Sequence, residues 1–285
     1  MTLNVDKPEI GIYANVPFEE YLKIRAVNHS TLKTVRRSAK QYKYHLTAPA
    51  TESASKLLGT AVHMALFEPE LFRQRIMSPP INPATGKAFG FDTKAYQECL
   101  KKNPGKLVVS DEDLDRINSM VEEIMSNPTA APLFKEPGVS EEVMIWRDKG
   151  LGVLCKARVD RRVLGICRLD LKTSEDISED GFGKSVVDYG YHTAEAFYLR
   201  GVRALCLAET DQVLIAVQNE PAYDCVVYGI PEELRVIGDK LVTEWVAKVA
   251  ACQKRDEWPG VQQEPGVIPI KAPAWYLQRF QDNEI

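Results

Sequence analysis

Three short β-rich runs separated by glycine turns lie between Val139 and Thr173: EEVMIWR, GLGVLCKARVDRRV and LGICRLDLKT. This pattern predicts three antiparallel strands in the middle of the chain. A long helical run follows over 182–208, then two more β-rich runs, DQVLIAVQN and YDCVVYGI, and a last amphipathic helix from Pro231 to about Arg255. We therefore expect an α/β fold in which helices flank a mixed central β-sheet.

The part of the chain before this centre is predicted to be helical. Ser30 is placed to cap a helix over STLKTVRRSAKQYKYHL, and ASKLLGTAVHMALFEPELF has a second helical period. The Pro/Gly-rich stretch Pro79–Gly90 predicts a loop, and Ser110 is placed to cap a helix over Asp111–Ser126.

We expect residues 1–285 to form one domain. Within it, 17–75 would be a helical N-terminal region with a basic segment, 139–255 the core, and 256–285 a C-terminal tail. The length of 285 residues and 45% hydrophobic content suit a globular chain and exclude a disordered one.

Composition also bounds the location and the cofactors. No run approaches the roughly 18 apolar residues of a membrane span, and the first residues lack the order of a signal peptide. The six cysteines are scattered without a CxxC pair, which argues against a zinc knuckle or an iron–sulfur cluster. A cytoplasmic protein with free thiols and no membrane contact is expected.

The net charge of −4 conceals a basic segment. No acidic residue lies between Tyr21 and Thr51, and the cations of this window are Lys23, Arg25, Lys33, Arg36, Arg37, Lys40 and Lys43. A basic face on an acidic protein suits a partner that carries phosphates. The alternative is a solvated surface whose charges are balanced by acidic residues elsewhere in the fold.

Asp160, Asp170 and Lys172 carry the candidate chemistry. Residues two apart in a strand share a face, so Asp170 and Lys172 project together, and a hairpin would bring Asp160 beside them. Two adjacent carboxylates repel unless a cation lies between them, and hard oxygen ligands favour Mg²⁺ or Mn²⁺. A surface ladder of solvated charges is the alternative, but the apolar neighbours Leu169 and Leu171 indicate a buried strand whose charges need partners.

At these residues the sequence resembles the PD-(D/E)XK nuclease superfamily, and within it the RecE-like phage and prophage exonucleases, which are related to the RecB nuclease domain and lambda exonuclease. Four segments carry the resemblance in order: FEEYLKIRAVNHSTLKTVRRSAKQYKYH, LGTAVHMALFEPELF, CKARVD…LDLKT and YGYHTAEAFYLRG. The resemblance spans about residues 17–275. It implies a restriction-endonuclease-like core with a mixed sheet flanked by helices.

The resemblance also implies site residues. Asp160 and Asp170 would be metal ligands, joined by the backbone carbonyl of Leu171, while Lys172 would position the attacking water. His63 would bind the second of two divalent ions, although a helix histidine bonded to a backbone group is the alternative.

A further carboxylate ligand is expected from the strand that precedes Asp160. Glu142 is the first candidate, and its neighbour Glu141 faces the other way along a strand. The choice between the two stays open.

Contacts with DNA are expected from two places. One is the basic segment, through Lys33, Arg36, Arg37, Lys40 and Lys43. The other is the helix after the strands, where Tyr191, His192 and Tyr198 match the family, but Ala194 stands where its members usually have a glutamine. An alanine cannot contact a phosphate or orient the lysine, so His192 is a possible substitute.

The function implied is a divalent-metal-dependent exodeoxyribonuclease that hydrolyses linear double-stranded DNA. By family analogy it would cut 5′ to 3′ and leave 3′ single-stranded tails for a single-strand annealing recombinase, as a ring-shaped homo-oligomer in a bacterial or phage-infected cytoplasm. Alternatives are a catalytically weak or inactive module that binds DNA ends and a structure-specific or single-strand nuclease of the same fold.

Overall fold

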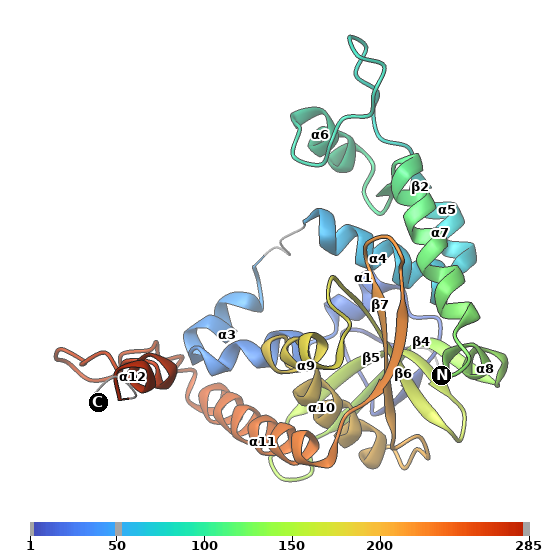
Figure 1. The fold of residues 1–285 in the computed structure, drawn as a ribbon. Coiled ribbons are helices and arrows are strands. Elements are labelled where there is room, and N and C mark those ends of the chain that lie inside the picture. The colour runs from blue at the N-terminus through green and yellow to red at the C-terminus, as the bar shows by residue number, and fades with distance from the viewer. Residues whose placement is uncertain (1–2, 49–52, 282–285) are drawn as a thin grey trace.

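The fold is built on a six-stranded β-sheet. The structure is a computed structural model, and it describes residues 3–48 and 53–281 (Figure 1). The strands of this sheet lie in the order β1-β4-β5-β6-β7-β8. Their bounds are Gly11–Tyr13 (β1), Gly138–Arg147 (β4), Leu154–Val163 (β5), Cys167–Ser174 (β6), Gln212–Gln218 (β7) and Cys225–Gly229 (β8).

The sheet is mixed, as the sequence predicted. β6 and β7 are parallel, whereas the other neighbouring strands of the sheet pair antiparallel. A parallel pair needs a long crossover, and the helices between β6 and β7 supply it. The antiparallel connections are short: Gly152 and Gly165, with φ angles of 68° and 74°, turn the chain between β4 and β5 and between β5 and β6.

The helices follow the sequence in three groups. Before the sheet come α1 (Phe18–Lys23), α2 (His29–Leu32), the 3₁₀ helix η1 (Lys33–Arg36), α3 (Ala39–His45), α4 (Ala54–Phe67) and α5 (Pro69–Arg75). Next are β2 (Ile76–Met77), α6 (Lys94–Lys102), β3 (Leu107–Val108), α7 (Asp111–Ser126) and α8 (Ala130–Lys135), with β2 and β3 forming a small parallel sheet. The last group is α9 (Glu179–Asp188), α10 (Tyr191–Ala204), α11 (Glu232–Arg255) and α12 (Ala274–Gln281).

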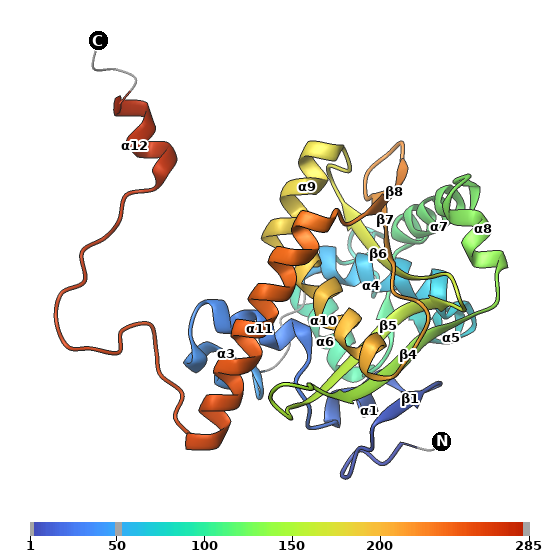
Figure 2. The same cartoon turned by 90° about the horizontal axis from the view of Figure 1, so that it is seen from below.

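Helices cover both faces of the large sheet (Figure 2). On one face α4, α7 and α8 pack on side chains of β6 and β7 such as Leu169 and Ile215. On the other face α10 and α11 pack on β4 and β5 around Trp146, and α9 packs on β7 around Leu214. The expected α/β architecture with helices flanking a mixed sheet is therefore confirmed.

Two expected helices are broken in the structure. The run expected as one helix after Ser30 forms α2, η1 and α3, because Asn28 caps α2 and Ser38 caps α3, each accepting a hydrogen bond from a backbone N–H. The run expected as one helix over 182–208 splits into α9 and α10 at Gly190, whose φ of 74° places it outside the helical region.

Other boundaries follow local signals. Ser110 caps α7 and Pro231 precedes α11, as predicted. The expected second helix ends at Phe67, since Glu68 leaves the helical conformation before α5 starts at Pro69. The sequence patterns did not predict β1, β2, β3, α6, α8 or α12.

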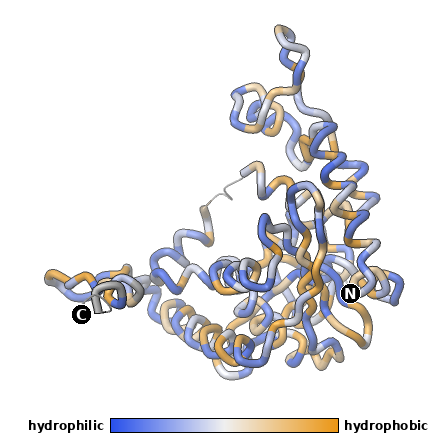
Figure 3. The backbone as a smooth tube through the Cα atoms, in the orientation of Figure 1, coloured by the Kyte–Doolittle hydropathy of each residue, from blue (hydrophilic) through white to orange (hydrophobic). Residues whose placement is uncertain are grey.

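Two parts of the chain extend away from the sheet (Figure 1). One is the loop that contains Pro79–Gly90, together with α6. The other is the segment between α11 and α12, which Figure 3 shows to include hydrophobic residues. Val267 and Ile270 of this segment are 98% and 97% exposed. Among the described residues, no helix combines the length and the apolar character needed to cross a membrane.

Candidate active site

Asp160 and Asp170 come together because β5 and β6 pair antiparallel. Arg161 pairs with Leu169, so the next step of the same register sets Asp160 opposite Asp170. The backbone N–H of Leu171 donates a hydrogen bond of 2.9 Å to Oδ2 of Asp160. The two carboxylates expected to share a site are neighbours, while the role of the Leu171 carbonyl stays a prediction.

Lys172 completes this group. Its Nζ donates a hydrogen bond to Oδ1 of Asp170 and lies 4.9 Å from the centre of the Tyr191 ring. Gln212, at the start of β7, donates from Nε2 to Oδ2 of Asp170 at 3.3 Å. The side chain of Asp170 is therefore held from two directions, by a cation and by an amide.

His63 approaches the carboxylates from α4. Its Nε2 lies 3.0 Å from Oδ2 of Asp160, and its Nδ1 lies 3.2 Å from Oε1 of Glu141. Ser53 caps the start of α4, and Val62, beside His63, is fully buried against the sheet, so packing fixes the helix that carries the imidazole. Both ring nitrogens face carboxylates, and the alternative of a histidine bonded to a backbone group is not what the structure shows.

Glu141, and not Glu142, joins this cluster. Glu141 has a φ of 56°, which interrupts the regular alternation of β4, and its Oε2 lies 2.8 Å from Nε of Arg158. Glu142 points to the other side, where its Oε2 accepts a 2.7 Å hydrogen bond from Nε of Arg162. The expectation that Glu142 is a ligand is corrected in favour of its neighbour, because the carboxylate of Glu142 is occupied elsewhere.

The electrostatics of the cluster are those of crowded carboxylates. Burial raises the pKa of Asp170 to about 6, helped by the charge of Asp160 and opposed by Lys172, and burial raises the pKa of Glu141 to about 7. Burial acts in the same direction on Asp160, but His63 and Lys172 hold its pKa below the ordinary value. Burial alone would lower the pKa of His63, whereas the charges of Asp160 and Glu141 raise it to about 9. The carboxylates together draw positive charge into the site.

The donor set fits a divalent cation. Among the described residues, one ligand atom each from His63, Glu141 and Asp160 lie within 4.8 Å of one another. Oε1 of Glu141 is buried and has no hydrogen-bond partner among the described residues, although Nδ1 of His63 lies 3.2 Å from it, so this oxygen is available to a cation. An imidazole and carboxylate oxygens are ligands that Mg²⁺, Mn²⁺ and similar ions accept. Asp170 adjoins this trio through Asp160 and can supply a further oxygen.

The residues of α10 divide between two faces. Tyr191 lies against Lys172, and burial raises the pKa of Tyr198, with the charges of Asp170 and Asp160 adding to it. His192 is 5% exposed and its Nδ1 lies 3.1 Å from the carbonyl oxygen of Val186. The expected DNA contact of His192, and its use in place of the missing glutamine, are therefore wrong, because a one-residue step along a helix turns its side chain away from the site.

The basic segment is partly used within the protein. Nζ of Lys33 donates to the carbonyl oxygen of Tyr189 at 3.1 Å, and Arg36 donates to that of Asp188 at 3.5 Å, where cations favourably meet the end of α9. Nζ of Lys43 lies 3.7 Å from Asp256. Of the five cations of this segment expected to contact DNA, the remaining two, Arg37 and Lys40, are exposed. Contact of these five residues with DNA stays a prediction, and Arg37 and Lys40 are the best placed for it.

Two residues of the site had weak or no signal in the sequence. Glu141 was recognisable as an alternative to Glu142, but only the positive φ of its backbone decides the choice. Gln212 had no local signal, because it reaches Asp170 only through the parallel pairing of β6 with β7.

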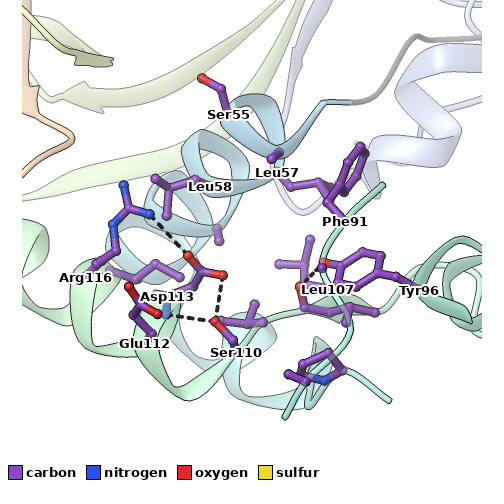
Figure 4. A pocket seen from close by; sticks show the side chains of 18 of the residues that line it. Ser55, Leu57, Leu58, Phe91, Tyr96, Leu107, Ser110, Glu112, Asp113 and Arg116 are labelled. Atoms are coloured by element: carbon purple, nitrogen blue, oxygen red, sulfur yellow. Dashed lines mark hydrogen bonds and ion pairs between the residues drawn. The ribbon is translucent and has the colours of Figure 1, made fainter. Parts of the chain in front are cut away.

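A cavity of about 470 Å³ lies apart from this cluster, between α4, α7 and the loop before α6 (Figure 4). Three of its polar side chains are engaged with one another or with the backbone: Ser110 bonds Asp113, and Arg116 bonds Asp113 and the carbonyl oxygen of Asn219. None of the cluster carboxylates lines it.

Comparisons with known proteins agree with the fold. The chain resembles in structure a candidate exonuclease from Eubacterium rectale, with a TM-score of 0.60 and 14% sequence identity over 93% of this chain and 98% of that one. A second solved structure, of the protein SSO0001, aligns with a TM-score of only 0.29 and 13% identity over 81% of this chain and 86% of that one. No curated protein matches the sequence.

The family is shown by the sequence itself. Residues 28–264 match the family described as a PDDEXK-like domain of unknown function, DUF3799. This match covers most of the chain and confirms the PD-(D/E)XK nuclease superfamily that the sequence motifs indicated, whereas the RecE-like branch stays a prediction. The chain belongs to the PDDEXK-like DUF3799 family.

Proposed function

We propose that this protein is a divalent-metal-dependent exodeoxyribonuclease that hydrolyses phosphodiester bonds of linear double-stranded DNA. The observation that carries the proposal is the meeting of His63, Glu141 and Asp160 with the Asp170–Lys172 pair at one point of the sheet. A buried cluster of carboxylates with shifted pKa values beside a lysine is typical of a catalytic site.

The residues divide the work between them. His63, Glu141, Asp160 and Asp170 would hold the divalent ions, expected to be two Mg²⁺ or Mn²⁺ per site. Bound there, such an ion supplies Lewis-acid stabilisation of a phosphate and lowers the pKa of water.

Lys172 contributes a fixed positive charge. Burial would lower the pKa of Lys172, but Asp170 and Asp160 raise it, so the side chain stays an ammonium. As a donor held by Asp170 beside Tyr191, it can orient a water molecule and stabilise negative charge on the phosphoryl oxygens. Gln212 fixes the other oxygen of Asp170 and so helps to keep this pair in place.

The finer properties rest on the resemblance to RecE-like exonucleases. They are degradation of the 5′-ended strand, release of 3′ single-stranded tails, a single-strand annealing recombinase as partner and a ring-shaped homo-oligomer. The E. rectale protein, described as a candidate exonuclease, supports the same class of activity for a chain of this fold.

Digestion of labelled DNA tests the proposal. A linear duplex, 5′-phosphorylated and labelled at either end, is incubated with and without Mg²⁺, beside a closed circular duplex. We expect loss of the linear DNA only, dependent on Mg²⁺, with the label that is released first reporting the polarity.

Two variants make the test specific. Lys172→Ala should abolish cleavage and leave DNA binding nearly intact, and Lys240→Ala, which removes an exposed lysine of α11, should cut like the parent. Parental cleavage by Lys172→Ala would refute the assigned site. Cutting of the circle would indicate an endonuclease, and binding without any cutting would indicate a module that only binds DNA ends.

A further inference from the structure

A groove of about 1400 Å³ lies beside the candidate active site. It is formed by α1 and the turn after it, α2 and η1, the end of α3, the first half of α4 and the hairpin between β4 and β5, with two residues of α11. None of the residues that carry the proposed chemistry lines it, so it is a surface that the site itself does not explain.

The charges along this groove have one sign. Its lining within the described chain includes no aspartate or glutamate, and its cations are Lys23, Arg25, Lys56, Arg147 and Lys156. This is unusual in a protein whose net charge is −4. A concave surface lined by one sign of charge concentrates ligands of the opposite sign, and a nucleic-acid backbone is such a ligand.

The cations have different tasks. Lys156 is buried, and its Nζ donates to the carbonyl oxygens of Tyr21 and Ile24 at 2.7 and 2.8 Å, so it holds the turn that forms one wall. Arg25, on that turn, is exposed and available to a phosphate. The groove is thus braced from inside by Lys156 and presents Arg25 to solvent, whereas Lys23 pairs with a glutamate outside the lining.

Two exposed aromatic rings line the groove. Phe18 of α1 is 46% exposed and Tyr44 of α3 is 62% exposed. Base faces are covered in a duplex but free in a single strand, and aromatic side chains in a cationic groove are the usual platforms for unpaired bases. The combination of rings and cations therefore favours a single strand over a duplex.

The groove leads to the carboxylate cluster. The guanidinium of Arg158 lies 5.3 Å from the centre of the Phe18 ring, and its Nε lies 2.8 Å from Oε2 of Glu141. On the other wall, Thr60 lines the groove one helical turn before His63. A strand that follows the groove thus reaches the residues assigned to catalysis.

We propose that this groove binds a single-stranded segment of DNA and passes it to the carboxylate cluster. The inference rests on the proposed nuclease function and adds that the DNA reaches the carboxylate cluster as a single strand. The end of the duplex would be unpaired before cleavage. The phosphates of the single strand would contact Arg25 and the other exposed cations of the groove, and its bases would stack on Tyr44 and Phe18.

Binding of oligo-dT and of a blunt duplex tests the inference. Both probes are fluorescently labelled and titrated with the full chain carrying Lys172→Ala, so that cutting does not interfere, at several salt concentrations. We expect Tyr44→Ala to raise the Kd for oligo-dT about tenfold, because the base that stacks on Tyr44 loses its platform. The Kd for blunt duplex should change much less, because the bases of a duplex are covered by their neighbours. Tyr44→Phe keeps the ring and should restore the affinity.

The cations give a second readout. Arg25→Ala should reduce the slope of log Kd against log salt for oligo-dT by about 0.7, the value for one lost phosphate contact on a single strand. Lys240→Ala, which removes an exposed lysine outside the groove, should leave this slope unchanged.

Failure of the inference can be told apart from failure of the proposed function. Parental affinity for oligo-dT in both Tyr44→Ala and Arg25→Ala, or equal losses for oligo-dT and blunt duplex, would overturn the single-strand groove. If the parent protein, which retains Lys172, still degrades linear duplex after such a result, the proposed nuclease function stands and only the single-strand groove fails. If that protein cuts no DNA but oligo-dT binding depends on Tyr44, the groove stands and the nuclease proposal fails.

Discussion

At the scale of single residues, the site depends on backbone conformation as much as on side-chain type. Glu141 and Glu142 are chemically identical neighbours, and both are buried. The positive φ of Glu141 turns its carboxylate to His63, while Glu142 pairs with Arg162 on the other side of the strand. Two adjacent glutamates thus have separate tasks, one in the candidate metal site and one in the packing of the sheet.

The two glutamates form a matched pair of substitutions. Glu141→Gln should weaken binding of Mn²⁺ by at least about tenfold, since it removes a charged ligand, and should reduce cleavage accordingly. Glu142→Gln should leave Mn²⁺ binding unchanged and lower the free energy of unfolding by about 1–3 kcal/mol, because Arg162 loses a charged partner.

Titration calorimetry with Mn²⁺ and urea denaturation separate these effects. If Glu142→Gln lost metal affinity and Glu141→Gln did not, the assignment of the ligand would be reversed.

At the scale of helices and strands, glycines set how closely elements approach. Gly238 of α11 faces α10, and a Cβ at this position would lie 2.5 Å from the carbonyl oxygen of His192. This contact fixes α10, and with it Tyr191 and Tyr198, against the sheet. Gly183 of α9 is different, since a Cβ there would meet no atom within 4 Å.

The same substitution should therefore have opposite effects in two helices. Gly238→Ala should lower the free energy of unfolding by about 1–3 kcal/mol, because α10 and α11 must move apart. Gly183→Ala should raise it by about 0.5–1 kcal/mol, because alanine loses less backbone entropy in a helix. Urea denaturation measures both, and a stabilising Gly238→Ala would contradict the close approach of the helices.

At the scale of the whole molecule, the candidate site joins distant parts of the chain. His63 comes from α4, Glu141 from β4, Asp160 from β5, and Asp170 from β6. In the free protein burial raises the pKa values of Asp170 and Glu141, and the charge of Asp160 adds to both shifts, so the charged forms of these two groups oppose folding. A bound cation should relieve that repulsion and tie α4 to the sheet.

Metal binding should for this reason stabilise the fold. At a Mn²⁺ concentration about 100 times the Kd, the free energy of unfolding should rise by about 2.7 kcal/mol, which corresponds to an increase in Tm of roughly 5–10 °C. EDTA should reverse the increase, and Asp160→Asn should abolish it. A Tm increase of the same size in Asp160→Asn would show that the stabilising ion binds elsewhere; differential scanning fluorimetry provides the measurement.

The sequence alone determined five of the six strands of the large sheet and most of the helical regions, and it predicted the central group of charged residues. Alternating residues and glycine turns predicted β4 to β8, and the spacing of Asp170 and Lys172 put them on one face, because these signals are local and have a fixed period. The matching family model confirms the superfamily that the motifs indicated.

Tertiary structure decided the remaining partners. Glu141 was selected by a backbone angle, Gln212 by a parallel strand pairing, His192 was turned away by helix phase, and the run over 182–208 was broken at Gly190. The cationic groove likewise gathers residues of α1, α3 and α4 with those of the β4–β5 hairpin. Contacts between residues far apart in the chain arise only when helices and strands pack, so no local period in the sequence could reveal them.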